Sequence, residues 1–213
     1  MEEKNTHNGH EFVDLGLPSG LKWATCNVGA TSPEQTGLYF AWGETKGYTA
    51  EQVEDGERAF DSSEYSSGPA ASISTDLTLE QDAARIYMGG KWRMPTKAEF
   101  EELFSNTTQT WTLDYNGTGV AGHIFVSKSN GKSVFFPAAG YRDNSPFYKA
   151  DLYGRYWTAS SDSRHCALYS CLGLYKVSFS RFGNYGVVPG YRDCGRPVRA
   201  IVDWPAFPII YNI

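Results

Sequence analysis

The sequence has no apolar run of about 18 residues, the length that a membrane-spanning helix needs. Its first ten residues, MEEKNTHNGH, also lack the apolar segment of a secretory signal. We therefore expect either a cytoplasmically made product, such as a virion component, or a chain from which an export signal has been removed. Lysine and arginine total 19 against 24 acidic residues, giving a formal charge of −5, which disfavours nucleic acid as a partner.

Cysteine is scarce, and its spacing fits no metal site. The four cysteines form no CxxC pair, so no zinc signature is present; they are Cys26, Cys166, Cys171 and Cys194. The absence of a dense disulfide framework favours free thiols. A bridge between Cys166 and Cys171 remains compatible with their spacing, because spacing alone does not report the geometry that a disulfide requires.

Catalytic motifs are absent as well. The four histidines occur without HExxH or any i, i+4 pairing, which excludes the common metalloprotease motif. Cys166 follows His165 directly, but neighbours on a strand face opposite sides of a sheet, so the pair is not expected to act as nucleophile and base. We predict that the protein is not an enzyme and needs no metal or cofactor.

Glycine and aromatic residues are abundant, with 22 Gly, 14 Tyr, 12 Phe and 6 Trp. Many glycines and short polar breaks indicate short strands joined by turns. Two Thr-x-x-Glu/Gln capping boxes, at 78–81 and 96–99, predict short helices over 82–88 and about 97–105. Residues 46–75 lack periodicity and predict a long surface loop. Strands are expected at 12–15, 21–27, 39–42, 111–115, 122–127, 132–136, 156–159, 167–174, 177–179 and 196–202.

Helices that precede a run of strands predict an α+β fold rather than βαβ units. We expect two short helices packed on small twisted antiparallel sheets, with much loop. The expected organisation is a flexible N-terminal tail over 1–10, one domain over 11–204 and a C-terminal tail over 205–213.

The segment from Tyr153 to Arg199 combines Tyr, Arg, Ser, Gly, Asn and Cys without a catalytic motif. That mixture is typical of a paratope, in which Tyr supplies rigid contact area and small polar residues supply adaptable hydrogen bonds. We therefore predict a binding surface. Its candidate ligand-binding residues are Arg155, Arg164, His165, Cys166, Tyr169, Cys171, Tyr175, Arg181, Phe182, Asn184, Tyr185, Val187, Tyr191, Asp193 and Cys194.

Several motifs resemble the "major paralogous domain" family of gut anaerobes. They are VDLGLPSGLKWATCNVGA (13–30), YFAWGET (39–45), GGKWRMPTKAEFEEL (89–103), FFPAAGYR (135–142), YWTAS (156–160) and RDCGRPVRAI (192–201). The resemblance runs in order from about residue 12 to residue 202. It implies a C-type lectin-like fold, similar to the variable proteins of diversity-generating retroelements, in which a reverse transcriptase randomises positions copied from template adenines.

The resemblance makes residues 155–194 the candidate variable region. Randomised Asn codons cannot encode Glu, Gln, Met, Lys or Trp. The segment from Tyr153 to Arg199 contains no Glu, Gln or Met, and only one Lys and one Trp. Surface cysteines, which proteins normally avoid, also favour diversification. The implied partner is a protein or glycan on a target surface, and the implied location is a cell surface or a phage virion.

Two alternatives remain. One is an undiversified structural or adhesion protein of the same family, since a strand-rich segment is poor in Glu in any case. The other is an enzyme of the formylglycine-generating type, although its paired catalytic cysteines are not recognisable here. Calcium-dependent sugar binding is not expected, because the Glu-Pro-Asn and Trp-Asn-Asp signatures are missing.

Trp23, Trp42, Trp92 and Trp157 lie within the family motifs, and we expect them in the core with their indole N–H groups hydrogen-bonded. Three arginines in similar contexts, Arg93, Arg142 and Arg199, are expected to pair with carboxylates or carbonyls.

Overall fold

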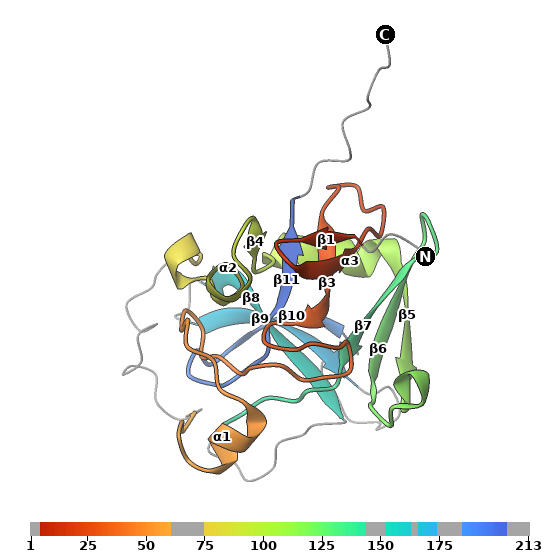
Figure 1. The fold of residues 1–213 in the computed structure, drawn as a ribbon. Coiled ribbons are helices and arrows are strands. Elements are labelled where there is room, and N and C mark those ends of the chain that lie inside the picture. The colour runs from red at the N-terminus through yellow and green to blue at the C-terminus, as the bar shows by residue number, and fades with distance from the viewer. Residues whose placement is uncertain (1–4, 61–74, 144–151, 163–165, 174–184, 204–213) are drawn as a thin grey trace.

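The computed structural model describes residues 5–60, 75–143, 152–162, 166–173 and 185–203. Within these ranges strands dominate, in three antiparallel sheets accompanied by a few short helices (Figure 1). The α+β prediction is confirmed. Strand β9 (Cys166–Gly173) and the residues Asp162, Tyr185 and Val188 are described by their backbone alone.

The central sheet joins the two ends of the described chain. Its order is β1 (Thr6–His7), β2 (His10–Val13), β3 (Lys22–Asn27), β11 (Arg199–Val202) and β4 (Trp92–Arg93). Strand β11, the last strand in the described part of the chain, thus lies between two strands from the first half of the sequence (Figure 1). The prediction of a flexible tail over 1–10 is wrong for residues 6–10, because the Asn8-Gly9 turn, with both residues at positive φ, pairs β1 with β2.

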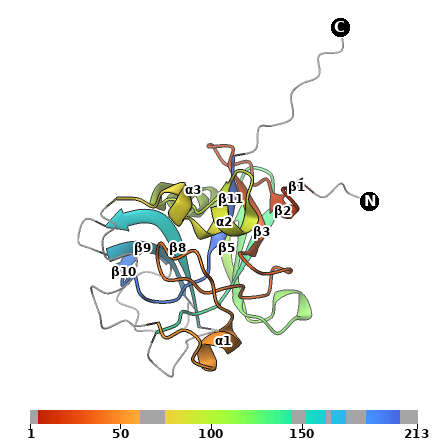
Figure 2. The same ribbon diagram turned by 60° about the vertical axis from the view of Figure 1, so that its left-hand side comes forward.

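Two further sheets have three strands each. One consists of β5 (Thr107–Thr112), β6 (Gly122–Ser127) and β7 (Ser133–Pro137). The other has the order β10 (Tyr185–Gly190), β9, β8 (Tyr153–Asp162), and in Figure 2 it comes forward on the left. The predicted strand at 122–127 is confirmed at both ends, whereas 177–179 lies outside the described residues.

The helices begin at side-chain caps. Thr96 and Glu99 form the predicted capping box of α3 (Lys97–Asn106), which buries Phe100 and Leu103. The box at Thr78 opens only a 3₁₀ turn, η2 (Leu79–Gln81), while α2 (Ala83–Met88) begins at Asp82. A second 3₁₀ turn, η3 (Tyr115–Gly117), precedes β6.

The predicted loop over 46–75 is wrong in its first part. Helix α1 (Ala50–Glu54) starts there from a further capping box, Thr49 with Gln52. Phe60 is also buried, in a small cluster with Tyr39 and Tyr48. Residues 61–74 lie outside the described part of the chain. The predicted strand at 39–42 is not formed. Tyr39 and Phe40 instead make isolated β-bridges, to Tyr48 and Arg196 respectively.

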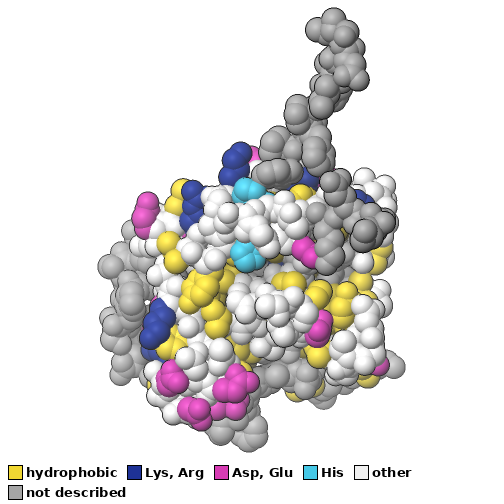
Figure 3. Space-filling view, viewed as in Figure 1, with side chains coloured by type: hydrophobic (Ala, Val, Ile, Leu, Met, Phe, Trp, Pro, Cys, Tyr) yellow, Lys and Arg dark blue, Asp and Glu magenta, His cyan; other side chains and the backbone are white. Residues whose placement is uncertain are grey.

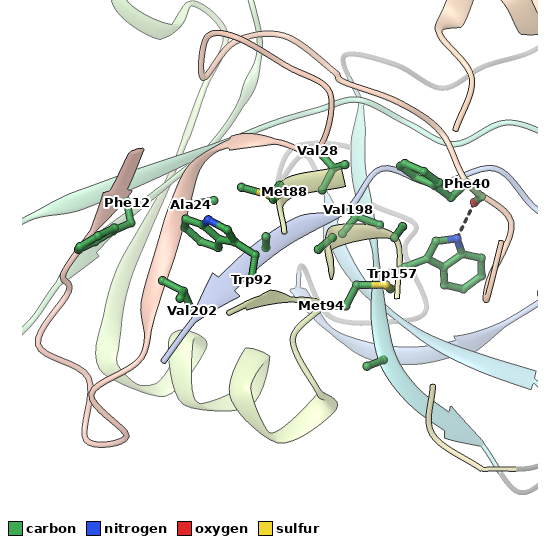
Figure 4. Close-up of a cluster of buried hydrophobic side chains, with 14 of the residues drawn as sticks. Phe12, Ala24, Val28, Phe40, Met88, Trp92, Met94, Trp157, Val198 and Val202 are labelled. Atoms are coloured by element: carbon green, nitrogen blue, oxygen red, sulfur yellow. Dashed lines mark hydrogen bonds between the residues drawn. The ribbon is translucent and has the colours of Figure 1, made fainter. Parts of the chain in front are cut away.

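All four tryptophans assigned to the core are at most 1% exposed. The main cluster contains Trp42, Trp92 and Trp157. Figure 4 shows Trp92 and Trp157 in this cluster. Trp157 Nε1 donates to the Phe40 carbonyl at 2.7 Å, and Trp42 Nε1 donates to the Thr158 carbonyl at 2.8 Å. Trp23 lies in a second cluster with Phe100 and Phe136.

Two of the three arginines expected to pair structurally, Arg93 and Arg199, belong to the central sheet. Arg93 donates two hydrogen bonds to the Glu99 carboxylate. Arg199 is fully buried and donates to Asn27 Oδ1 at 2.8 Å and to the carbonyls of Ala24 and Thr25 at 3.0 and 2.9 Å. Burial lowers its pKa to about 10, so the guanidinium remains charged at neutral pH. These hydrogen bonds connect strand β11 to strand β3.

Candidate functional site

The candidate region is carried by β8, whose backbone is anchored by segments distant in sequence. Gly140 N donates to the Tyr153 carbonyl at 2.7 Å, and Trp157 N donates to the Pro197 carbonyl at 3.1 Å. Further along, Ala159 N donates to the Pro95 carbonyl at 2.8 Å. Strand β9 pairs with β8 from Tyr153↔Gly173 to Asp162↔Cys166, with a register shift between Trp157 and Ser161, and β10 pairs with β9 over its whole length. The strand at the base of the candidate face is therefore fixed by the framework.

Aromatic rings and guanidinium groups alternate from the surface into the core beside β8. Arg155 lies 4.1 Å from the ring centroid of Tyr141 and 5.6 Å from that of Tyr153. Arg196 lies 5.9 Å from Tyr141 and 4.0 Å from Trp157. We call these five residues the cation–π ladder. Its outer members, Tyr141, Tyr153 and Arg155, are half-buried, and its inner pair is almost fully buried.

Two more arginines lie against rings near the ladder. Arg192 is 4.5 Å from the Trp42 ring, and Arg142 is 4.9 Å from the Tyr39 ring. Arg142 also forms an ion pair with Glu54 at 3.3 Å, which confirms the structural role expected for it. Glu54 belongs to α1, where acidic side chains gather at the lower left of Figure 3. Stacking on rings suits arginine because its guanidinium is planar and weakly hydrated.

Only part of the predicted site is described. Six of its residues lie outside the described part of the chain: Arg164, His165, Tyr175, Arg181, Phe182 and Asn184. Four more are placed by their backbone alone, in β9 or β10: Cys166, Tyr169, Cys171 and Tyr185. The remaining five are Arg155, Val187, Tyr191, Asp193 and Cys194.

Tyr191 is 44% exposed, Arg155 and Asp193 are half-buried, and Val187 packs in part against the cluster around Trp23. The prediction that Cys194 is an exposed contact residue is wrong. Its side chain is 2% exposed, and burial raises the pKa of its thiol although Arg196 opposes that shift. Cys194 is buried because the chain on either side of it is held by the core: Trp42 N donates to the Arg192 carbonyl, and Gly195 pairs with Arg142.

Sequence reasoning missed four residues of this region: Tyr141, Tyr153, Arg192 and Arg196. A signal for them exists, since Tyr and Arg recur together in GYR (140–142), YGRY (153–156) and GYR (190–192). What the sequence does not reveal is that these separate motifs converge beside β8.

Among the described residues, no cluster of three or more His, Cys, Asp or Glu side chains could hold a metal ion. Cys26 and Cys194 are free thiols. None of the helices in the described ranges has the length and apolar character required to traverse a bilayer. No protein-family model, curated protein or solved structure matches this chain.

Proposed function

We propose that the protein is a non-catalytic recognition protein with a C-type lectin-like architecture. Its C-terminal face, built from residues 155–194, binds a protein or glycan on a target surface. The contacts are non-covalent and come from Tyr, Arg and small polar side chains that a retroelement diversifies. The motifs between residues 13 and 201 support this architecture, and the composition of residues 153–199 supports the mode of binding.

The observation that carries the proposal is the cation–π ladder. A binding face whose side chains vary needs a backbone that is already ordered before the ligand binds. If the backbone had to become ordered on association, the lost conformational freedom would lower the affinity. Arg196 on Trp157 holds the inner end of the ladder within the core. At the outer end Arg155 lies 4.1 and 5.6 Å from the centroids of two tyrosine rings, and Tyr and Arg are among the residues enriched in binding hot spots.

The proposal makes a position-by-position claim that sequencing tests. The gene would be sequenced from many independent isolates, together with its genomic neighbourhood. Differences should concentrate within residues 155–194, at sites where a near-identical repeat beside a reverse-transcriptase gene carries adenines. Trp157, Arg192 and Arg196 should stay constant, since they hold the framework. Uniformly spread differences, or the lack of a repeat, would favour the undiversified adhesion protein.

A binding experiment addresses recognition itself. The purified chain would be applied to a glycan array and to a panel of intact bacterial cells, with Tyr191→Ala as the variant. Leu113→Ala is the matched control, since Leu113 is also exposed, at 69%, and lies outside residues 155–194. Loss of a signal in Tyr191→Ala alone is expected. Equal loss in both variants, or in neither, would count against the assigned face.

A further inference from the structure

Asparagine precedes glycine at three places in the described part of the chain, at 8–9, 116–117 and 130–131. In such a sequence the glycine nitrogen can attack the preceding side-chain amide, because glycine has no Cβ to hinder the approach. The attack closes a succinimide ring and releases ammonia, and water then opens the ring to aspartate or isoaspartate. The reaction is spontaneous, so the folded environment of each asparagine sets its rate.

The three sites are alike in exposure and in free space. Asn8, Asn116 and Asn130 are all exposed, and a Cβ built on the glycine that follows each of them would meet no atom within 4 Å. Asn8 and Asn116 also share a left-handed backbone, with φ of 47° and 53°. Solvent access and room for the ring therefore do not distinguish the three sites.

The side-chain amides of two of these asparagines are held by hydrogen bonds. Asn8 Nδ2 donates to the Met88 carbonyl at 2.5 Å. Asn130 Nδ2 donates to the Asp14 carbonyl at 2.9 Å, and Asn130 Oδ1 accepts from Lys132 N at 3.0 Å. The side-chain nitrogen is the leaving group of the reaction, so these bonds must break before ammonia can depart.

Asn116 differs in this respect. It lies in the η3 turn between β5 and β6, at the lower right of Figure 1. Its side chain has no hydrogen-bond partner among the described residues. The turn is closed by other groups, since Tyr115 N donates to the Val120 carbonyl at 2.9 Å. The Asn116 amide can therefore rotate toward the Gly117 nitrogen without losing a bond.

We propose that Asn116 is the site at which the folded protein deamidates. The Gly117 nitrogen loses its proton, bonds to Cγ of Asn116 and displaces the amide nitrogen, which leaves as ammonia. One water molecule then opens the ring, and a carboxylate replaces the neutral amide in a turn that already contains Asp114. The isoaspartate product also lengthens the backbone inside the turn, so it should weaken the bond from Tyr115 N to the Val120 carbonyl.

Folded and unfolded protein would be compared at all three sites. The intact chain would be incubated in warm, mildly alkaline buffer with and without guanidinium chloride, and peptide mass spectrometry would follow each asparagine. In the folded protein Asn116 should convert at least about tenfold faster than Asn8 and Asn130, the scale of the hydrogen bonds that those amides must lose. In guanidinium chloride the three rates should converge. Equal rates in the folded protein would overturn the proposal. The same ranking in the unfolded chain would also overturn it, since sequence alone would then set the rates.

Two variants and the product test the route. Asn116→Gln keeps a neutral amide but needs a larger ring that closes more slowly, so position 116 should stay unconverted over the same time. Asn130→Gln is the matched control and should leave the rate at Asn116 unchanged. Isoaspartate should appear beside aspartate at position 116, because water can open the ring at either carbonyl. Aspartate alone, or conversion of Asn116→Gln at an undiminished rate, would refute cyclisation. A circular dichroism spectrum and an unchanged melting temperature would show that both variants are folded.

Discussion

The guanidinium of Arg196 lies 4.0 Å from the ring centroid of Trp157, and both side chains are at most 2% exposed. Arg196 Nη1 also donates to the Tyr191 carbonyl at 3.1 Å. One side chain thus connects the strand at the base of the candidate face with the segment that follows β10. Because the contact is buried, it stabilises more than the same pair would at the surface.

Arg196→Ala should lower the free energy of unfolding by about 2 kcal/mol or more, since it removes a desolvated cation–π contact and leaves a cavity. Arg196→Lys keeps the charge but loses the planar stacking surface, and it should recover only part of that stability. Urea unfolding measures both variants. Equal stability of Arg196→Lys and the unchanged chain would show that charge alone matters.

Gly37 and Gly20 form a matched pair for backbone strain. Both have positive φ, at +72° and +75°, but a Cβ on Gly37 would lie 2.5 Å from the Val28 carbonyl oxygen, whereas one on Gly20 would meet no atom within 4 Å. Gly20→Ala should cost only the conformational term, roughly 1–2 kcal/mol. Gly37→Ala should cost clearly more, because backbone must shift. Thermal unfolding compares the two, and equal costs would contradict the close approach at Gly37.

Glu99 predicts a pH dependence of stability. Burial alone would raise the pKa of its carboxyl, but the hydrogen bonds from Arg93 and from Thr96 N lower it below the usual value of 4.5. A carboxyl whose folded pKa is lowered stabilises the protein above its unfolded pKa, and this stability is lost as the pH falls through the folded pKa. Unfolding free energies measured below pH 5 should therefore decline less steeply in Glu99→Gln. An identical pH profile would exclude this contribution.

Asp82 needs both of its carboxylate oxygens. Oδ1 accepts from Arg85 N at 3.0 Å and Oδ2 accepts from Met94 N at 2.8 Å, while burial raises the pKa of the group. An asparagine offers only one acceptor oxygen, so Asp82→Asn should leave a backbone N–H without its acceptor and cost about 1–3 kcal/mol. Asp76→Asn is the control, because only Oδ1 of Asp76 accepts, from Ser161. Similar losses in both variants at neutral pH would contradict the argument.

Local signals in the sequence predicted the elements that local chemistry determines. The capping box at Thr96 and the spacing of Phe100, Leu103 and Phe104 predicted α3 to within one residue of its observed end. Helix α1 was missed although Thr49 and Gln52 form the same kind of box. It has only five residues and buries none of them, so no hydrophobic period marks it.

The long-range features had no local signal. Strand β11 pairs with β3, which lies more than 170 residues earlier. The sequence of neither strand indicates that the two pair. The cation–π ladder likewise depends on Tyr141, Arg155 and Arg196 coming together through the sheets. The composition of residues 153–199 indicated a surface rich in Tyr and Arg, but it did not indicate which members anchor the chain. For the same reason Cys194 was placed on the outside, although it is buried.

The position of β11 bears on how the gene tolerates change. Any frameshift or premature stop codon upstream of residue 199 deletes the strand that joins β3 to β4, and with it the buried Arg199. Such truncated products would fail to complete the central sheet and would be open to proteolysis. Missense changes in the candidate variable region leave that strand intact. Completion of the central sheet therefore requires translation through Val202.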